Sequence, residues 1–88
     1  MAWTIEWDER AIQEAKKLGA RARKQIIKYL EERIAPARDP RTFGKALTGG
    51  KLGLWRYRVE DYRIICRIED NRFVVLVIKI GHRKNVYD

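Results

Sequence analysis

The chain has 88 residues, of which 45% are hydrophobic, and its formal net charge is +8 at pH 7. This composition is that of one small globular domain and excludes a disordered chain. No apolar run approaches the ~20 residues that cross a bilayer, and one cysteine with one histidine can form neither an internal disulfide nor a structural zinc site. Because no segment has the pattern of a signal peptide, we expect residues 1–88 to form a single cytoplasmic domain without a cofactor.

The first half of the chain predicts one strand followed by two helices. Residues 3–7 alternate apolar and polar side chains, as in a half-buried strand. Asp8 is a favourable N-cap for a helix that ends before Gly19. A second helix is expected over residues 20–34, with one apolar stripe and many cations elsewhere, and Pro36 cannot continue it. The two helices are therefore expected to form an antiparallel hairpin.

A glycine-rich segment separates the helices from the rest of the chain. Residues 41–53 contain four glycines and show little periodicity. We expect a mobile loop here, with positive charge from Lys45 and Lys51. One turn of helix is expected within it, formed by Phe43, Ala46 and Leu47.

The remainder of the chain predicts three successive strands. Residues 54–59 and 62–68 flank Glu60-Asp61, where a two-residue hairpin turn fits. Residues 72–80 are apolar on both faces, which is typical of an inner strand. The fold class is thus α+β in the order β-α-α-β-β-β, with a two-helix hairpin covering one face of a small, mostly antiparallel sheet.

Alternation divides the predicted strand hairpin into two unlike faces. The face expected under the helices holds Trp55, Tyr57, Tyr62, Ile64 and Cys66. The opposite, open and concave face carries four arginines, Arg56, Arg58, Arg63 and Arg67. Like charges opposite one another destabilise a sheet, whereas guanidinium groups match phosphate. We therefore interpret the four arginines as a binding site for a polyanion rather than as a face that is merely solvated. Nucleic acid is the first candidate ligand, before an anionic membrane surface or an acidic protein.

The C-terminal residues 81–88 bring Arg83 and Tyr87 to the edge of the sheet where Arg63 is expected. Arginines with one tyrosine can promote RNA cleavage in which the substrate's 2′-hydroxyl attacks the neighbouring phosphate. Tyr87 or a basic side chain would transfer the protons. DNA lacks the 2′-hydroxyl, so this reaction is restricted to RNA.

Other catalytic centres find little support in the sequence. A Ser-His-Asp centre is excluded because the chain has no serine, and the scattered carboxylates do not suggest a metal site. Cys66 and His82 form a conceivable nucleophile pair, but Cys66 is expected in the core. His82 neighbours Arg83, so on an extended backbone it points to the opposite face.

The order and spacing of four segments resemble the RelE family of the RelE/ParE toxin superfamily. These segments are WDERA (7–11), LWRYRV (54–59), DYR (61–63) and GHRKNVY (81–87). The resemblance implies the toxin of a type II toxin–antitoxin system, an mRNA endonuclease that acts without metal in the ribosomal A site, beside 16S rRNA. It also implies a RelB-like antitoxin that docks around the helix hairpin and sheet edge, and operator DNA bound only through that antitoxin.

The resemblance extends to individual residues of the expected site. Arg63, Arg83 and Tyr87 match the family's catalytic arginines and tyrosine, and Arg56 matches a basic position. Leu54 stands where the family has a second lysine, and Arg56 is a poor base because its guanidinium stays protonated. The general base is therefore open, with Lys51 as one substitute. The residues expected to bind RNA are Lys51, Arg58 and Lys84.

Two other functions remain open from the sequence. A ParE-like toxin shares the fold but acts by binding DNA gyrase, and such chains are expected to lack the combination of Arg63, Arg83 and Tyr87. A non-catalytic RNA-binding module would use the same arginine face without cleaving its ligand. Salt-sensitive binding to RNA without cleavage on translating ribosomes would indicate that module.

Overall fold

The computed structural model of the chain describes residues 2–47 and 53–82. Four residues of the predicted site, Lys51, Arg83, Lys84 and Tyr87, lie outside the described residues, and their roles stay predictions. Within the described ranges, no helix is both long and apolar enough to cross a bilayer.

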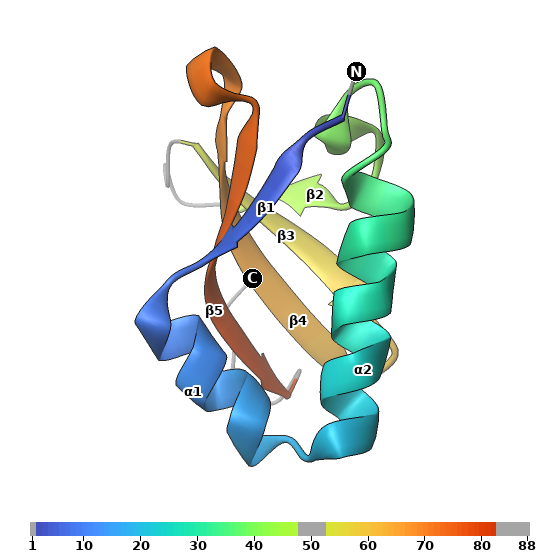
Figure 1. Cartoon of the computed structure of the whole chain (residues 1–88), viewed down its shortest axis with the longest axis vertical. Helices are drawn as coiled ribbons and strands as arrows, with labels where there is room; N and C mark the ends of the chain where they lie inside the picture. The colour runs from blue at the N-terminus through green and yellow to red at the C-terminus, as the bar shows by residue number, and fades with distance from the viewer. Residues whose placement is uncertain (1, 48–52, 83–88) are drawn as a thin grey trace.

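The described chain follows the predicted order, with one short strand and two 3-10 turns added. Its elements are β1 (Thr4–Trp7), α1 (Glu9–Lys17), α2 (Ala20–Tyr29), a π-helical turn (Leu30–Ile34), a 3-10 turn (Pro40–Thr42), β2 (Lys45–Ala46), β3 (Leu54–Val59), β4 (Tyr62–Glu69), a second 3-10 turn (Asp70–Arg72) and β5 (Val74–His82). Asp8 occupies the N-cap of α1 with extended backbone, although its side chain makes no capping hydrogen bond. Gly19 joins the helices at φ 93°, a conformation that glycine adopts readily. From this turn α2 runs back along the sheet and diverges from α1 (Figure 1).

The five strands form one sheet in the order β1-β5-β4-β3-β2. All neighbours are antiparallel except β1 and β5, which pair in parallel. Strand β5 therefore lies inside the sheet, as its apolar sequence predicts. Both helices lie on the same side of the sheet (Figure 1), with α1 packed on β5 and α2 on β3. The opposite face is left open by the helices, which confirms the predicted two-layer arrangement.

The hairpin of β3 and β4 has the predicted register. Val59 pairs with Tyr62 across Glu60-Asp61, and Arg58 pairs with Arg63. Glu60 adopts a positive φ of 54°, the region that primed hairpin turns require. The turn therefore forms even though it lacks the glycine that usually supplies this conformation.

The core lies between the helices and the predicted apolar face of the hairpin. Tyr57, Ile64 and Cys66 are fully buried, in one cluster with Ile26 of α2 and Leu30 of the π-helical turn that follows it. Each such apolar side chain contributes about 1.5–3 kcal/mol through its removal from water. The Tyr57 hydroxyl donates a 2.7 Å hydrogen bond to the carbonyl oxygen of Pro40, so its one polar group is satisfied.

The prediction of one helical turn at Phe43, Ala46 and Leu47 is wrong, because no helix forms there and Lys45–Ala46 pairs with β3 as β2. The Trp55 indole Nε1 donates a 2.6 Å hydrogen bond to the carbonyl oxygen of Phe43. Gly44 has a φ of 75°, and a Cβ at this position would collide with the backbone oxygen of Arg56. The hydrogen bond from Trp55 and the close approach of Gly44 to the backbone of β3 therefore hold this segment in a conformation that its weak local helical pattern does not predict.

A β-bulge interrupts the alternation of β5. Val77 pairs with Cys66 and Lys79 pairs with Ile65, so Ile78 is an extra residue between them. After the bulge, Ile80 enters the core and Lys79 lies on the open face. The Glu14 carboxylate of α1 accepts a 2.7 Å hydrogen bond from the backbone N–H of Ile80, which ties the helix layer to this part of β5.

We predict that Gly44→Ala lowers the free energy of unfolding by more than ~2 kcal/mol, because the added methyl group collides with the backbone of β3. Gly53→Ala is the matched control, since Gly53 has a similar φ of 78° but open space at its Cβ position. The Gly53→Ala substitution should lower the free energy of unfolding by only about 1 kcal/mol, the cost of holding alanine in a left-handed backbone conformation. Urea denaturation of the three proteins measures the difference, and equal losses would contradict the close packing of β2 on β3.

Candidate nucleic-acid interface

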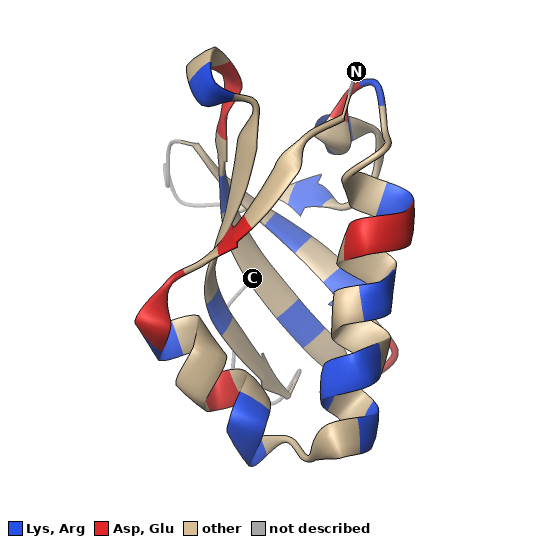
Figure 2. Ribbon diagram, viewed as in Figure 1, with Lys and Arg blue, Asp and Glu red and all other residues tan. Residues whose placement is uncertain are grey.

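Cations from four neighbouring strands share the sheet face that the helices leave open. The register pairs Lys45 with Arg56, and Arg58 with Arg63. Ile65 lies on the same face, between Arg56 on one side and Lys79 on the other. We call this set the basic face, and its members are Lys45, Arg56, Arg58, Arg63, Arg67 and Lys79. Figure 2 shows their positions as basic segments across β2 to β5.

The pairing on the basic face is unfavourable for the isolated protein. Two pairs of like charges, Lys45 with Arg56 and Arg58 with Arg63, lie directly opposite each other on adjacent strands. Each such pair destabilises a sheet, by an amount on the order of a few tenths of a kcal/mol. A phosphate group lying between the cations would reverse the sign of this interaction.

Burial differs across the basic face. Lys45, Arg58 and Arg67 are exposed, whereas Arg56 and Arg63 are half-buried. Ile65 is only 4% exposed although it lies on this face, which gives the surface an apolar floor near its centre. Charge–phosphate contacts beside such a floor are screened less than contacts in open water.

Two arginines outside the basic face, Arg41 and Arg72, have carboxylate partners. Arg41 forms a two-pronged contact with Asp70, at 2.9 and 2.8 Å, and holds the pKa of that carboxyl below its usual value. Arg72 bridges Glu69 at 2.7 Å and Glu6 at 3.2 Å. Along the strands that carry the basic face, no Asp or Glu occupies a position between its cations.

The structure brings together three of the residues predicted for the site. Arg56, Arg58 and Arg63 lie on one open face, as alternation predicts, and Arg67 joins them. Arg63 pairs with Gly81, next to the point where the described part of β5 ends at His82. The predicted partners Arg83 and Tyr87, and the RNA-binding candidates Lys51 and Lys84, fall outside the described residues.

Two cations of the basic face cannot be placed there from the sequence pattern. The sequence predicts only a mobile loop at Lys45, because the two-residue strand is too short to produce a periodic signal. Lys79 lies in an apolar strand, and strict alternation would place it under the helices with Val75 and Val77. The bulge at Ile78 reverses that assignment.

The Cys66–His82 nucleophile pair is not formed. Cys66 is fully buried, and burial raises the pKa of its thiol, so the reactive thiolate is disfavoured. His82 pairs with Tyr62 on the helix side of the sheet, and the two rings meet edge to face at 5.9 Å. His82 therefore lies on the face opposite to Arg63; its predicted orientation relative to Arg83 concerns a residue outside the described ranges and stays a prediction. Among residues 2–47 and 53–82, no three His, Cys, Asp or Glu side chains cluster as metal ligands.

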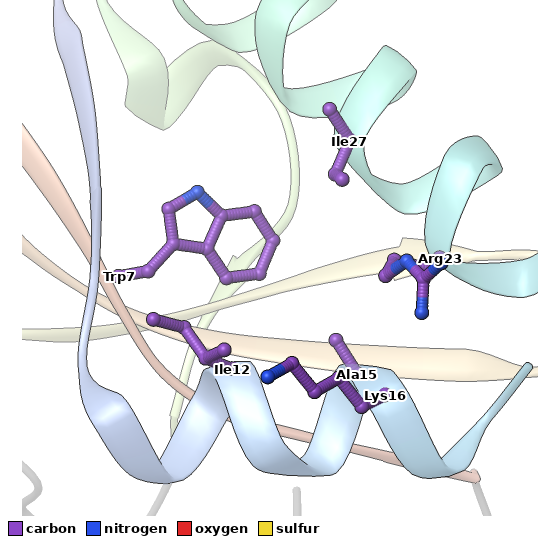
Figure 3. A pocket seen from close by; sticks show the side chains of 6 residues that line it. All are labelled: Trp7, Ile12, Ala15, Lys16, Arg23 and Ile27. Atoms are coloured by element: carbon purple, nitrogen blue, oxygen red, sulfur yellow. The ribbon is translucent and has the colours of Figure 1, made fainter. Parts of the chain in front are cut away.

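A second feature of the surface is an apolar groove between the two helices, with a volume of about 440 Å³ (Figure 3). Its lining consists of Trp7, Ile12, Ala15, Lys16, Arg23 and Ile27. Ile12 is 39% exposed and Ile27 is 41% exposed, so both contribute solvent-accessible apolar surface to the groove. The charged residues in this lining are both cations, so the groove combines an apolar floor with a positive rim.

Comparisons with known proteins agree on one superfamily. The chain matches the family model of the ParE toxin of the type II toxin–antitoxin system parDE over residues 5–87. It is 35% identical to the mRNA interferase toxin RelE of Escherichia coli K12, with 96% of this chain and 86% of that protein covered.

Solved structures show the same fold. The RelBE2 toxin–antitoxin complex of Mycobacterium tuberculosis matches with a TM-score of 0.84 at 24% identity, covering 97% of this chain and 95% of that chain. The intact RelBE toxin–antitoxin complex of E. coli matches with a TM-score of 0.71 at 30% identity, covering 92% of this chain and 96% of that chain. The chain therefore belongs to the RelE/ParE superfamily of type II toxin–antitoxin toxins.

Proposed function

We propose that this toxin cleaves mRNA on the ribosome, by attack of the substrate's 2′-hydroxyl on the adjacent phosphate. The observation that carries the proposal is the basic face, where six cations lie on adjacent strands without intervening carboxylates. The 35% identity to an mRNA interferase supports the same activity. The ribosomal A site is proposed as the place of cleavage, where the mRNA lies beside 16S rRNA.

The basic face suits the charge that develops during this reaction. Negative charge grows on the non-bridging oxygens of the phosphate in the transition state, and fixed guanidinium groups stabilise it there. We assign this role to Arg63 and Arg83, with Arg56 beside them. Arg58, Lys51 and Lys84 are assigned to binding the RNA backbone, which orders the reacting atoms in line.

Two protons must move during the reaction, one from the 2′-hydroxyl and one to the leaving 5′-oxygen. We assign one transfer to Tyr87. Leu54, on the face of β3 that carries Arg56, has no group that can accept a proton. Lys51 remains one alternative base, and the amines of Lys45 and Lys79 on the basic face are others.

A gyrase-binding toxin is the second candidate function, favoured by the match to the family model of ParE toxins. Such a toxin acts by binding a protein and has no need to gather cations opposite one another on a sheet. The combination of Arg63, Arg83 and Tyr87 in the sequence favours RNA cleavage over this alternative.

We further propose a RelB-like antitoxin as the protein partner, through which alone the complex binds operator DNA. The matched E. coli structure is an intact toxin–antitoxin complex. The groove between α1 and α2 supports a docking place for an amphipathic helix, because Ile12 and Ile27 offer an apolar strip. Lys16 and Arg23 on the rim favour acidic side chains on that helix.

Arg83→Ala and Tyr87→Phe should each abolish growth arrest when the toxin is induced, because one removes phosphate stabilisation and the other a proton-transfer group. Losses in cleavage rate on the order of 100-fold or more are expected for single changes of this kind. Thermal unfolding and antitoxin affinity should stay at wild-type values. If both variants remain fully toxic, the assigned centre is wrong.

Mapping of mRNA 5′ ends after brief induction distinguishes the candidate functions. Cuts within translated codons are expected from the proposed activity. DNA damage with intact mRNA would contradict mRNA cleavage and would indicate a gyrase-binding toxin instead. Ribosome binding without any cuts would indicate a non-catalytic RNA-binding module.

Ile27→Asp should weaken antitoxin binding at least ~10-fold, because it places a carboxylate in the apolar strip of the groove and opposes an acidic partner. Phe73→Asp is the matched control, since Phe73 is 44% exposed but lies away from the groove at φ 52°, a conformation that Asp tolerates. Titration of each variant with purified antitoxin measures the affinities. If the two substitutions weaken antitoxin binding equally, the groove is not the docking place of the antitoxin.

A further inference from the structure

Among the described residues, lysines and arginines gather on two separate surfaces. One is the basic face of the sheet. The other lies in the helix layer, where residues 16–28 contain six cations and no Asp or Glu. The rest of the sequence carries 8 basic and 12 acidic side chains, so the two surfaces together account for more than the whole net charge. The six cations of the helix layer are Lys16, Lys17, Arg21, Arg23, Lys24 and Lys28.

Three of these cations form a stripe along α2. Arg21, Lys24 and Lys28 are spaced by three and four residues, so they lie on one side of the helix. All three are exposed, whereas Ala22 and Ile26 on the other side of the helix are buried. We call this set the helix stripe. These exposed side chains belong to the helix layer, which covers the face of the sheet opposite to the basic face.

The helix stripe is unfavourable for the fold itself. Lys24 and Lys28 are like charges at positions i and i+4, which repel each other on a helix. Arg21 lies in the first turn of α2, which contains no acidic residue, although the positive end of a helix favours anions. Among the described residues, no carboxylate forms an ion pair with any of the three. A ligand that supplies negative charge would offset all of these repulsions.

We propose that the helix stripe is a second RNA-binding surface, which holds the phosphate backbone of ribosomal RNA while the basic face holds the mRNA. This inference rests on the proposed function, because it requires the toxin to work on the ribosome. The toxin then contacts two RNA segments from opposite sides. The stripe sets the affinity for the ribosome, and the basic face carries the chemistry.

The composition of the helix stripe favours an RNA backbone over a protein partner. Protein interfaces have an apolar or aromatic centre that is poor in lysine, and the stripe contains cations alone. The exposed apolar side chain of α2, Ile27, lines the groove on the α1 side instead. Lysine and arginine contacts to phosphate need no such centre and carry no sequence preference.

The dimensions of the stripe fit several phosphates rather than one. Arg21 and Lys28 are seven residues apart, a rise of about 10 Å along the helix. In double-helical nucleic acid the charges of one strand repeat at intervals of about 3.4 Å along the axis. A segment of backbone, and not a single terminal phosphate, therefore matches the row of cations.

The test compares the triple variant Arg21→Gln/Lys24→Gln/Lys28→Gln with wild-type toxin on 70S ribosomes programmed with mRNA and with a vacant A site. Affinity is measured over a series of KCl concentrations, together with kcat and KM for mRNA cleavage. We expect Kd and KM to rise on the order of tenfold, and the slope of log Kd against log salt to fall by about 2 to 3. The value of kcat should change less than twofold.

Two control variants isolate the contribution of the stripe. Arg10→Gln/Arg38→Gln/Arg72→Gln removes the same charge from positions outside both basic surfaces, and should leave the salt slope close to that of wild type. Arg21→Lys/Lys24→Arg/Lys28→Arg keeps the charge of the stripe, and should retain the affinity. Thermal unfolding of every variant establishes that each is folded, and antitoxin affinity is measured for each.

The outcomes separate this inference from the proposed function. If wild-type toxin cuts mRNA on ribosomes and the stripe variant matches it in Kd and salt slope, the inference is wrong and the proposed function stands. The inference is also wrong if the stripe variant loses antitoxin affinity alone, since the stripe then binds protein. If wild-type toxin neither binds nor cuts on ribosomes, the proposed function fails and the inference fails with it.

Discussion

The pairing of β3 with β4 is the interaction on which the rest of the structure depends. The two-residue turn sets Val59 opposite Tyr62, and this register directs Tyr57, Ile64 and Cys66 into the core. The same register directs the arginines of both strands to the open face. A slip of one residue would exchange the faces and place guanidinium groups under the helices, at a cost of several kcal/mol for each buried charge. The packing of the core therefore fixes the positions of the cations on the basic face, although these like charges repel one another.

Features outside the hairpin complete the basic face and hold its neighbours in place. The hydrogen bonds from Trp55 to Phe43 and from Tyr57 to Pro40 keep the preceding segment against β3. That segment then supplies Lys45 opposite Arg56. On the other side, the bulge in β5 turns Lys79 outward. Each of these contacts is made by buried or half-buried groups, so the positions of Lys45 and Lys79 follow from the packing beneath them.

The molecule thus separates three kinds of surface on a domain of 88 residues. The sheet presents the basic face, the helix layer presents the helix stripe, and an apolar groove lies between α1 and α2. The proposed function requires the toxin to bind RNA when it is active and an antitoxin when it is silenced, and such a division serves both requirements. Apolar contact gives affinity for a folded partner, whereas clustered cations give affinity for a polyanion that depends on salt.

The sequence by itself determined the element order, the inner position of β5, the burial of Cys66 and the common face of Arg56, Arg58 and Arg63. These features follow from local rules, because strand alternation, helical spacing and turn residues act over only a few positions. Only the tertiary structure decided the parallel pairing of β1 with β5, the strand at Lys45–Ala46 and the outward position of Lys79. Those features depend on contacts between residues distant in sequence, such as the Trp55–Phe43 hydrogen bond and the ladder around Ile78, and such contacts leave no periodic trace in the chain.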